Sequence, residues 1–128
     1  MVKKAFLLPQ EVETFYVIPT LRRYLAVSLK EKGMKQKDIA GLLQINTATI
    51  SQYASSKRGH KIDFSPEVAA EIKQAALRIK DQFTYIQEMH KMLQMVRKTN
   101  VLCQIHKQFS DIPNHCEPAL VGCSVAVK

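Results

Sequence analysis

The stretch KQKDIAGLLQINTATISQYASSKRG, from Lys35 to Gly59, decides the expected fold. Apolar residues recur at helical spacing on both sides of a short gap at residues 44–46, so the stretch predicts helices over 36–43 and 47–54. Asn46 stands where it can cap the second helix. The second helix carries uncharged polar side chains, and basic residues follow it directly. This combination is typical of a surface that meets the edges of DNA bases beside a phosphate backbone.

A helix-turn-helix needs a small residue where its helices cross and apolar residues where they touch. Ala40 occupies the expected crossing point. The second helix can then lie in the major groove of DNA with its first half facing the bases. The apolar residues expected at the contacts are Ile39, Leu43, Ile45, Ile50 and Tyr53.

The residues expected to contact DNA divide into base readers and phosphate contacts. Glutamine can pair bidentately with adenine, and serine or threonine can donate or accept. Gln36 and the N–H groups that begin its helix can contact a phosphate. The expected set is Gln36, Asn46, Thr47, Ala48, Ser51, Gln52, Lys57, Arg58, His60 and Lys61, with Arg22, Arg23, Lys35 and Lys37 as further phosphate contacts.

Two segments before this stretch are also expected to be helical. Residues 10–18 predict a short helix that ends at Pro19, with an extended arm as the alternative. Residues 20–32 predict a second helix because leucines recur there at every fourth position. Thr20 can cap this helix and Gly33 can end it.

The run from Glu67 to Ile112 contains neither glycine nor proline. Ser65 and Pro66 form a strong helix start. Apolar residues then recur in heptads, which predicts one long helix over 63–100 that pairs with a second copy as a coiled coil. The alternative is a helix packed on its own head. The two heptad series are Ile72, Ile79, Ile86 and Leu93, and Val68, Ala75, Met89 and Val96.

The charge of the chain is concentrated in its first half. The formal net charge is +8, and residues 1–62 hold 11 Lys and Arg against 4 Asp and Glu. This asymmetry favours a nucleic acid as partner over a membrane, since the basic residues do not share one apolar helix face. No apolar run reaches the roughly 18–20 residues that span a bilayer, and the N-terminal apolar stretch is too short for a secretion signal. We therefore expect a cytoplasmic protein.

The sequence predicts no enzyme. It contains no nucleophile elbow, no glycine-rich phosphate loop and no paired carboxylates, and no small-molecule substrate is expected.

The segment QKDIAGLLQINTATISQYASSKRG resembles the helix-turn-helix of Cro and the phage repressors. Residues 7–62 are similar to a group of predicted transcriptional regulators common in archaea, which share the leucine–proline opening, a P-x-x-R at Pro19 and the SQY…KRG ending. The resemblance implies a five-helix-like DNA-binding head, a dimer on DNA, and recognition through Thr47, Ala48 and Gln52. The group has glycine where this chain has Gln44, in a left-handed position that costs about 1–2 kcal/mol for other residues. The turn is thus expected to be slightly strained or to open differently.

Cysteines occur only near the C-terminus, in the pattern C-x2-H-x9-C-x6-C. Three thiolates and one imidazole could hold tetrahedral zinc or an iron–sulfur cluster. The group named above often carries a C-terminal cysteine cluster that begins with C-x2-C, which implies bound metal. The alternatives are reduced cysteines without a metal, and His115 as a competing ligand. The expected ligands are Cys103, His106, Cys116 and Cys123.

These features together predict an all-α protein with an N-terminal helix-turn-helix bundle followed by a long dimerisation helix. The expected divisions are a DNA-binding domain over 1–62, the long helix over 63–100 and a Cys/His segment over 101–128. The expected function is a dimeric, sequence-specific transcriptional regulator on an inverted-repeat DNA operator, with a metallocentre that senses iron, oxidant or redox state. The alternative is a protein–protein adaptor or antitoxin-like module whose long helix binds a partner.

Overall fold

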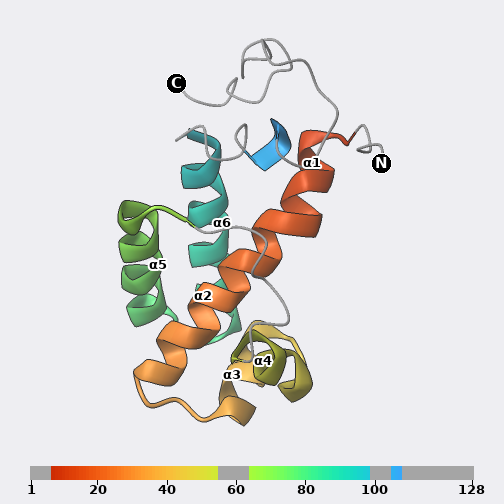
Figure 1. Cartoon of the computed structure of the whole chain (residues 1–128). Helices are drawn as coiled ribbons and strands as arrows, with labels where there is room; N and C mark the ends of the chain where they lie inside the picture. Colours follow the sequence, from red (N-terminus) through yellow and green to blue (C-terminus); the bar gives the residue numbers. More distant parts are fainter. Residues whose placement is uncertain (1–6, 55–63, 99–104, 108–128) are drawn as a thin grey trace.

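The computed structural model describes residues 7–54, 64–98 and 105–107, and its regular elements in these ranges are all helical (Figure 1). The all-α prediction is therefore confirmed for the described part of the chain. The elements are α1 (Pro9–Val12), the π-helix η1 (Glu13–Val17), α2 (Ile18–Glu31), α3 (Gln36–Leu43), α4 (Thr47–Ala54), α5 (Pro66–Arg78) and α6 (Gln82–Lys98). None of the described helices is long and apolar enough to cross a bilayer.

The first three elements join end to end in one rod (Figure 1). Helix α1 begins with Pro9 at its first position, and the Leu8 N–H donates to the Glu11 carboxylate at 2.9 Å. The helical prediction for residues 10–18 is confirmed, but the helix does not end at Pro19. Proline lacks an N–H and its ring crowds the carbonyl four residues earlier, so it kinks or breaks an ordinary α-helix. The wider π-turn of η1 precedes Pro19, with the Ile18 N–H bonded to the Glu13 carbonyl.

Thr20 does not cap a helix, contrary to the sequence-based expectation. It lies inside the rod, buried, and its hydroxyl donates to the Tyr16 carbonyl at 2.7 Å. The cap prediction was wrong because the rod continues through Pro19. Gly33 ends α2 as expected, with φ of +101°.

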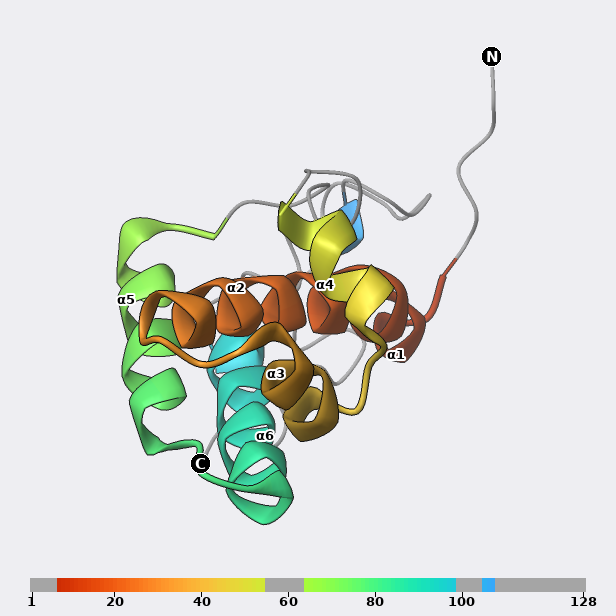
Figure 2. The same ribbon diagram turned by 90° about the horizontal axis from the view of Figure 1, so that it is seen from below.

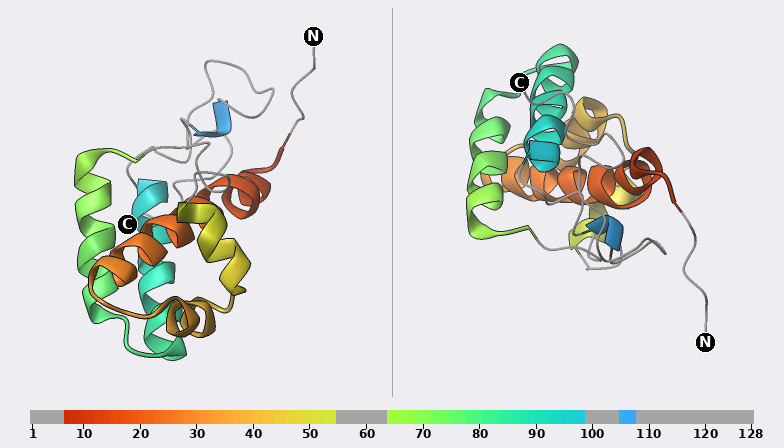
Figure 3. Two further views of the ribbon diagram at one scale, coloured as in Figure 1. Left: turned by 60° about the horizontal axis from the view of Figure 1, so that its bottom comes forward. Right: turned by 90° about the horizontal axis from the view of Figure 1, so that it is seen from above.

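Helix α2 is the centre of the fold and packs against α3, α4, α5 and α6. Its predicted leucine stripe is confirmed, since all three leucines are fully buried. Helices α4 and α6 lie on opposite sides of α2, as Figure 2 and the right-hand view of Figure 3 show. The buried leucines of α2 are Leu21, Leu25 and Leu29.

The predicted long helix over 63–100 is wrong for the described residues, because the chain turns between α5 and α6. Ile79 has extended backbone after α5, and Asp81 directly precedes the next helix. The Asp81 carboxylate accepts from the Thr84 N–H at 2.8 Å, as a helix-capping residue does. That hydrogen bond lowers the pKa of Asp81 below its usual value. The expected start of α5 is confirmed, since the Ser65 hydroxyl accepts from the Val68 N–H at 3.3 Å.

Most of the heptad residues are buried in the core of the molecule. Ile72, Ile79 and Val96 are buried against the chain's own core, whereas Ile86 is 60% exposed. Most of this pattern therefore fits the alternative expectation, in which the heptad residues pack against the N-terminal helices of the same chain. A coiled-coil seam built on these residues would have to expose the core first.

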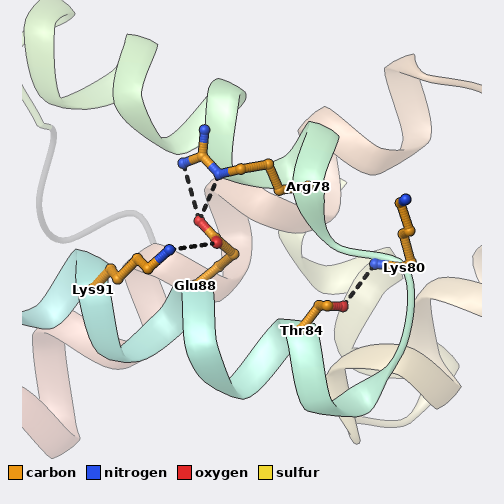
Figure 4. Close-up of polar contacts among 5 residues, drawn as sticks. All are labelled: Arg78, Lys80, Thr84, Glu88 and Lys91. Carbon is orange, nitrogen blue, oxygen red and sulfur yellow. Dashed lines mark hydrogen bonds and ion pairs between the residues drawn. The ribbon is translucent and has the colours of Figure 1, made fainter.

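Glu88 on α6, which is only 5% exposed, forms one ion pair with α5 and a second within its own helix (Figure 4). Arg78 on α5 approaches its Oε1 at 3.0 Å, and Lys91 approaches its Oε2 at 3.3 Å. The hydrogen bond from Arg78 lowers the pKa of Glu88. Figure 4 also shows the Lys80 N–H donating to the Thr84 hydroxyl, at 2.8 Å, in the turn between the helices.

A second buried carboxylate ties the rod to the end of α6. Glu13 is 6% exposed, and the guanidinium of Arg97 donates to both of its oxygens, at 2.7 and 3.0 Å. This bidentate geometry is the strongest form of a carboxylate–arginine pair.

Candidate nucleic-acid interface

Helix α4 presents small uncharged side chains to the surface. Thr47, Ala48 and Ser51 are exposed, whereas Thr49 and Ile50 are buried. The helix bounds agree with the expected 47–54, and the expected burial of Ile50 is confirmed. One turn and a half of helix thus displays hydroxyl and methyl groups with no charge among them.

The connection between α3 and α4 is held by two local features. Gln44 has φ of +57° and ψ of +44°, so the expected left-handed backbone is present without the glycine that favours it. The Ile45 N–H donates to the Ala40 carbonyl at 3.0 Å, which closes the turn. Asn46 caps α4 as expected: its Oδ1 accepts from the N–H and the hydroxyl of Thr49, at 2.7 and 2.9 Å. Asn46 is therefore a structural cap in the described chain.

The side chain of Gln36 links the start of α3 to the exposed face of α4. Its Nε2 donates to the Thr47 carbonyl at 2.9 Å and to the Ser51 hydroxyl at 2.8 Å. An amide has two N–H groups, and both acceptors lie on α4. A phosphate at this position would therefore compete with α4 for the Gln36 amide, while the first N–H groups of α3 remain oriented for an anion.

The burial of α3 agrees with the expected contacts. Ile39, Ala40 and Leu43 are buried, and Ile45 is half-buried at the turn. These residues pack α3 against α2 and α4. Gln52, expected on the reading face, is half-buried, whereas Ser51 is exposed.

The basic residues near this surface differ in what they contact. Lys35 and Lys37 are exposed at the start of α3. The Arg22 Nε donates to the Tyr85 hydroxyl at 3.2 Å, and Arg23 lies over the ring of Tyr24, 4.5 Å from its centroid. The two lysines thus suit a phosphate contact better than the two arginines, which take part in packing.

Several expected site residues lie outside the described residues. They are Lys57, Arg58, His60 and Lys61 after α4, and Cys103, Cys116 and Cys123 of the expected metal set.

His106 is the one expected metal ligand within the described residues. It is buried, and its Nε2 lies 2.6 Å from the Leu7 carbonyl oxygen at the other end of the described chain. Among the described residues, no group of three or more His, Cys, Asp or Glu side chains is arranged to hold a metal.

Sequence reasoning missed the bond between Gln36 and Ser51 and the buried carboxylates of Glu13 and Glu88. The pair of Gln36 and Ser51 had a usable signal, since both lie on facing helices of an expected helix-turn-helix. The ion pair of Glu13 had no such signal in the sequence, because its partner Arg97 lies 84 residues away.

No protein-family model, curated protein or solved structure matches this chain. Function is therefore inferred from the surface of α4 and its neighbours.

Proposed function

We propose that the protein is a sequence-specific DNA-binding transcriptional regulator whose reading surface is the exposed side of α4. The observation that carries the proposal is the set of exposed, uncharged residues Thr47, Ala48 and Ser51, fixed in place by Gln36 and Asn46. Side chains on a rigid element with few rotamers lose little entropy on binding, so they can discriminate between base edges.

The arrangement of α3 and α4 supports a helix-turn-helix role. Both helices pack on α2, and α4 follows α3 after a tight left-handed turn. In a helix-turn-helix the second helix enters the major groove while the first crosses the backbone. The exposed Lys35 and Lys37 at the start of α3 are then the phosphate contacts, and the basic residues beyond α4 add to them.

A dimer on an inverted-repeat operator completes the proposal. Each copy carries one reading helix, and a second copy doubles the contacts over two half-sites about one helical turn, or a multiple of it, apart. Direct occupation of the operator is then the means of regulation.

Binding to random duplexes at several salt concentrations tests the proposal. We expect affinity to fall steeply as salt rises, because phosphate contacts release counterions. Lys37→Ala should reduce the slope of log K against log salt by about one unit without changing the preferred sequence. Glu31→Gln, at an exposed acidic position of α2, is the control for a change of surface charge. Binding that is insensitive to salt would contradict the proposal.

A protein–protein adaptor or antitoxin-like module is the competing function. It would capture a protein partner in a way that competitor DNA does not disturb. Capture of such a partner together with no measurable affinity for any duplex would favour the adaptor.

A metal-linked or redox-linked signal is a further part of the proposal. His106 supports it, since its Nε2 hydrogen-bonds a backbone carbonyl, an arrangement that metal-binding histidines often have at the nitrogen that does not hold the metal. Nδ1 is then the atom that would hold zinc or an iron–sulfur cluster beside the three cysteines. Anaerobic purification with an absorption spectrum and metal analysis tests this part. A colourless, metal-free protein with unchanged DNA affinity would refute it.

A further inference from the structure

The exposed residues of α4 carry methyl groups beside one hydroxyl group. Thr47 and Ala48 are exposed in the first turn of the helix, and Ser51 is exposed one turn further on. Residues three and four positions apart are neighbours on the surface of a helix, so Ser51 adjoins both of the others. These three residues form one small surface, which we name the α4 patch.

The sequence of α4 lacks the charged side chains that read G·C base pairs in the major groove. Arginine and lysine donate to the acceptors of guanine, and aspartate and glutamate accept from the amino group of cytosine. None of these four residue types occurs in Thr47–Ala54. Helix α4 therefore has no charged side chain with which to select a G·C pair.

The amide side chains near the α4 patch are engaged within the chain or half-buried. A bidentate pair with adenine needs both the oxygen and an N–H of one amide. The Oδ1 of Asn46 already accepts an N–H and a hydroxyl of α4, at 2.7 and 2.9 Å, and the Nε2 of Gln36 donates to two acceptors on α4. Gln52 is half-buried, and the base that a glutamine reads is adenine, the partner of thymine. Base recognition by the patch itself therefore depends on its hydroxyl and methyl groups.

The groups of the α4 patch are complementary to the edge of thymine. The Ser51 Oγ accepts from Gln36 at 2.8 Å, so the Ser51 hydroxyl hydrogen is directed elsewhere and can be donated to a base. Thymine presents its O4 acceptor next to its 5-methyl group, and among the four bases only thymine has a methyl group in the major groove. A hydroxyl donor that adjoins the methyl groups of Thr47 and Ala48 matches this edge. Guanine and adenine offer acceptors without a methyl group, and cytosine offers an amino donor there.

We infer that the α4 patch recognises thymine through its 5-methyl group, so that each half-site of the DNA partner contains an A·T pair at the position that α4 reads. Ser51 donates to O4, and the methyl groups of Thr47 and Ala48 pack against the thymine methyl group and exclude water from it. This inference rests on the proposed function and adds to it the base that is read. Burial of one methyl group corresponds to a gain in affinity of about fourfold.

Uracil scanning of the preferred duplex is the first test. Uracil has the hydrogen-bonding groups of thymine and lacks only the 5-methyl group. The full chain first selects its motif from random duplexes, and each thymine of that motif is then replaced in turn by deoxyuridine. We expect the affinity, measured by fluorescence anisotropy, to fall about fourfold at one thymine or more of each half-site and to stay unchanged at the other thymines.

Removal of the methyl groups from the protein shows whether α4 makes the contact. In a chain that combines Thr47→Ser with Ala48→Gly, the ratio of the affinities for the thymine and uracil duplexes should fall to about one, because the protein methyl groups are gone. Thr47→Ser alone, which keeps the hydroxyl and the alanine, should lower the ratio part of the way. Thr14→Ser is the matched control, since Thr14 is exposed on η1 and loses the same methyl group. Its affinity ratio and the far-ultraviolet circular dichroism of all three variants should equal those of the wild type.

The outcomes separate this inference from the proposed function. A wild-type chain that binds a defined motif with the same affinity whether it contains thymine or uracil would overturn the inference and leave the proposed function standing. A preference for thymine over uracil that is undiminished in the chain with both substitutions would also overturn it, because another part of the protein would then read the methyl group. A wild-type chain that enriches no motif would refute both.

Discussion

The amide of Gln36 on α3 donates a hydrogen bond to the hydroxyl of Ser51 on α4, with Nε2 2.8 Å from Oγ. Because the hydroxyl oxygen accepts from Gln36, its own hydrogen is directed elsewhere. Ser51 is exposed, so this hydrogen can be donated to an acceptor on a base edge, such as a purine N7 or a thymine O4. Gln36 thereby sets which way the Ser51 hydroxyl can donate on the proposed reading surface.

A double-mutant cycle on Gln36 and Ser51 should reveal this dependence. We expect Ser51→Ala to weaken binding to the preferred duplex by about 1 kcal/mol, the typical net value of one hydrogen bond. Gln36→Ala should cost about the same in the wild type and less in the Ser51→Ala background. Fluorescence anisotropy with labelled duplex measures all four affinities. Additive losses would show that Gln36 does not act through Ser51.

Gln44→Gly should stabilise the fold. Gln44 occupies a left-handed conformation that costs a residue with a Cβ about 1–2 kcal/mol, and glycine loses part of that gain through the entropy of its unfolded state. We expect a net gain of about 0.5–1 kcal/mol in the free energy of unfolding, measured by urea denaturation. Gly33→Ala is the converse control. Gly33 has φ of +101°, so its replacement by alanine should lower the free energy of unfolding. A loss of stability in Gln44→Gly would mean that the glutamine side chain has a structural role.

Protonation of Glu88 should make the free energy of unfolding decrease as the pH is lowered. The hydrogen bond from Arg78 lowers the pKa of Glu88, so the ionised form is favoured by folding. The resulting stabilisation is present above the unfolded-state pKa, near 4.5, and is lost as pH falls through the lower folded-state value.

The matching experiment is denaturation of the wild type and Glu88→Gln between neutral and acidic pH. The variant should be less stable by about 1–3 kcal/mol at neutral pH, and the difference should shrink below the unfolded-state pKa. Glu71→Gln, at an exposed position of α5, should follow the wild type throughout. If the difference in the free energy of unfolding between the wild type and Glu88→Gln did not change with pH, the pH dependence could not be assigned to Glu88.

Arg97→Ala should be destabilising. It leaves the buried carboxylate of Glu13 without its bidentate partner, and because the Arg97 side chain is itself 41% exposed, we expect a loss of about 1–3 kcal/mol rather than the larger cost of breaking a fully buried pair. Adding Glu13→Gln to Arg97→Ala should restore part of the loss, because no uncompensated charge then stays buried. Thermal or urea unfolding measures both variants. A loss below about 1 kcal/mol in Arg97→Ala would show that the pair contributes no more than an exposed ion pair.

The sequence predicts local structure well wherever a local signal controls it. The bounds of α3 and α4, the Asn46 and Ser65 caps and the leucine stripe of α2 all follow from residues within one or two turns. The left-handed Gln44 was expected from the resemblance, in which a glycine stands at this position. The sequence did not reveal that a π-turn carries the helix through Pro19. That outcome depends on the packing of the whole rod.

The turn between α5 and α6 shows the limit of periodicity. A heptad pattern without glycine or proline continues across residues 79–81, but Asp81 and Thr84 supply a capping signal that begins a new helix. The same apolar spacing serves a coiled coil or a helix hairpin packed on α2. The buried carboxylates of Glu13 and Glu88 pair with the exposed side chains of Arg97 and Arg78. These ion pairs favour the hairpin, and they become visible only once distant segments are brought together.

Selection of bound duplexes from a random pool, carried out in parallel with the wild type, Ser51→Ala and Lys37→Ala, tests the central claim most directly. The account predicts a defined motif for the wild type, relaxed preference at one base position of each half-site for Ser51→Ala, and an unchanged motif with weaker overall binding for Lys37→Ala. If the wild type enriches no motif, or if Ser51→Ala enriches the same motif as the wild type, α4 does not read DNA through this face.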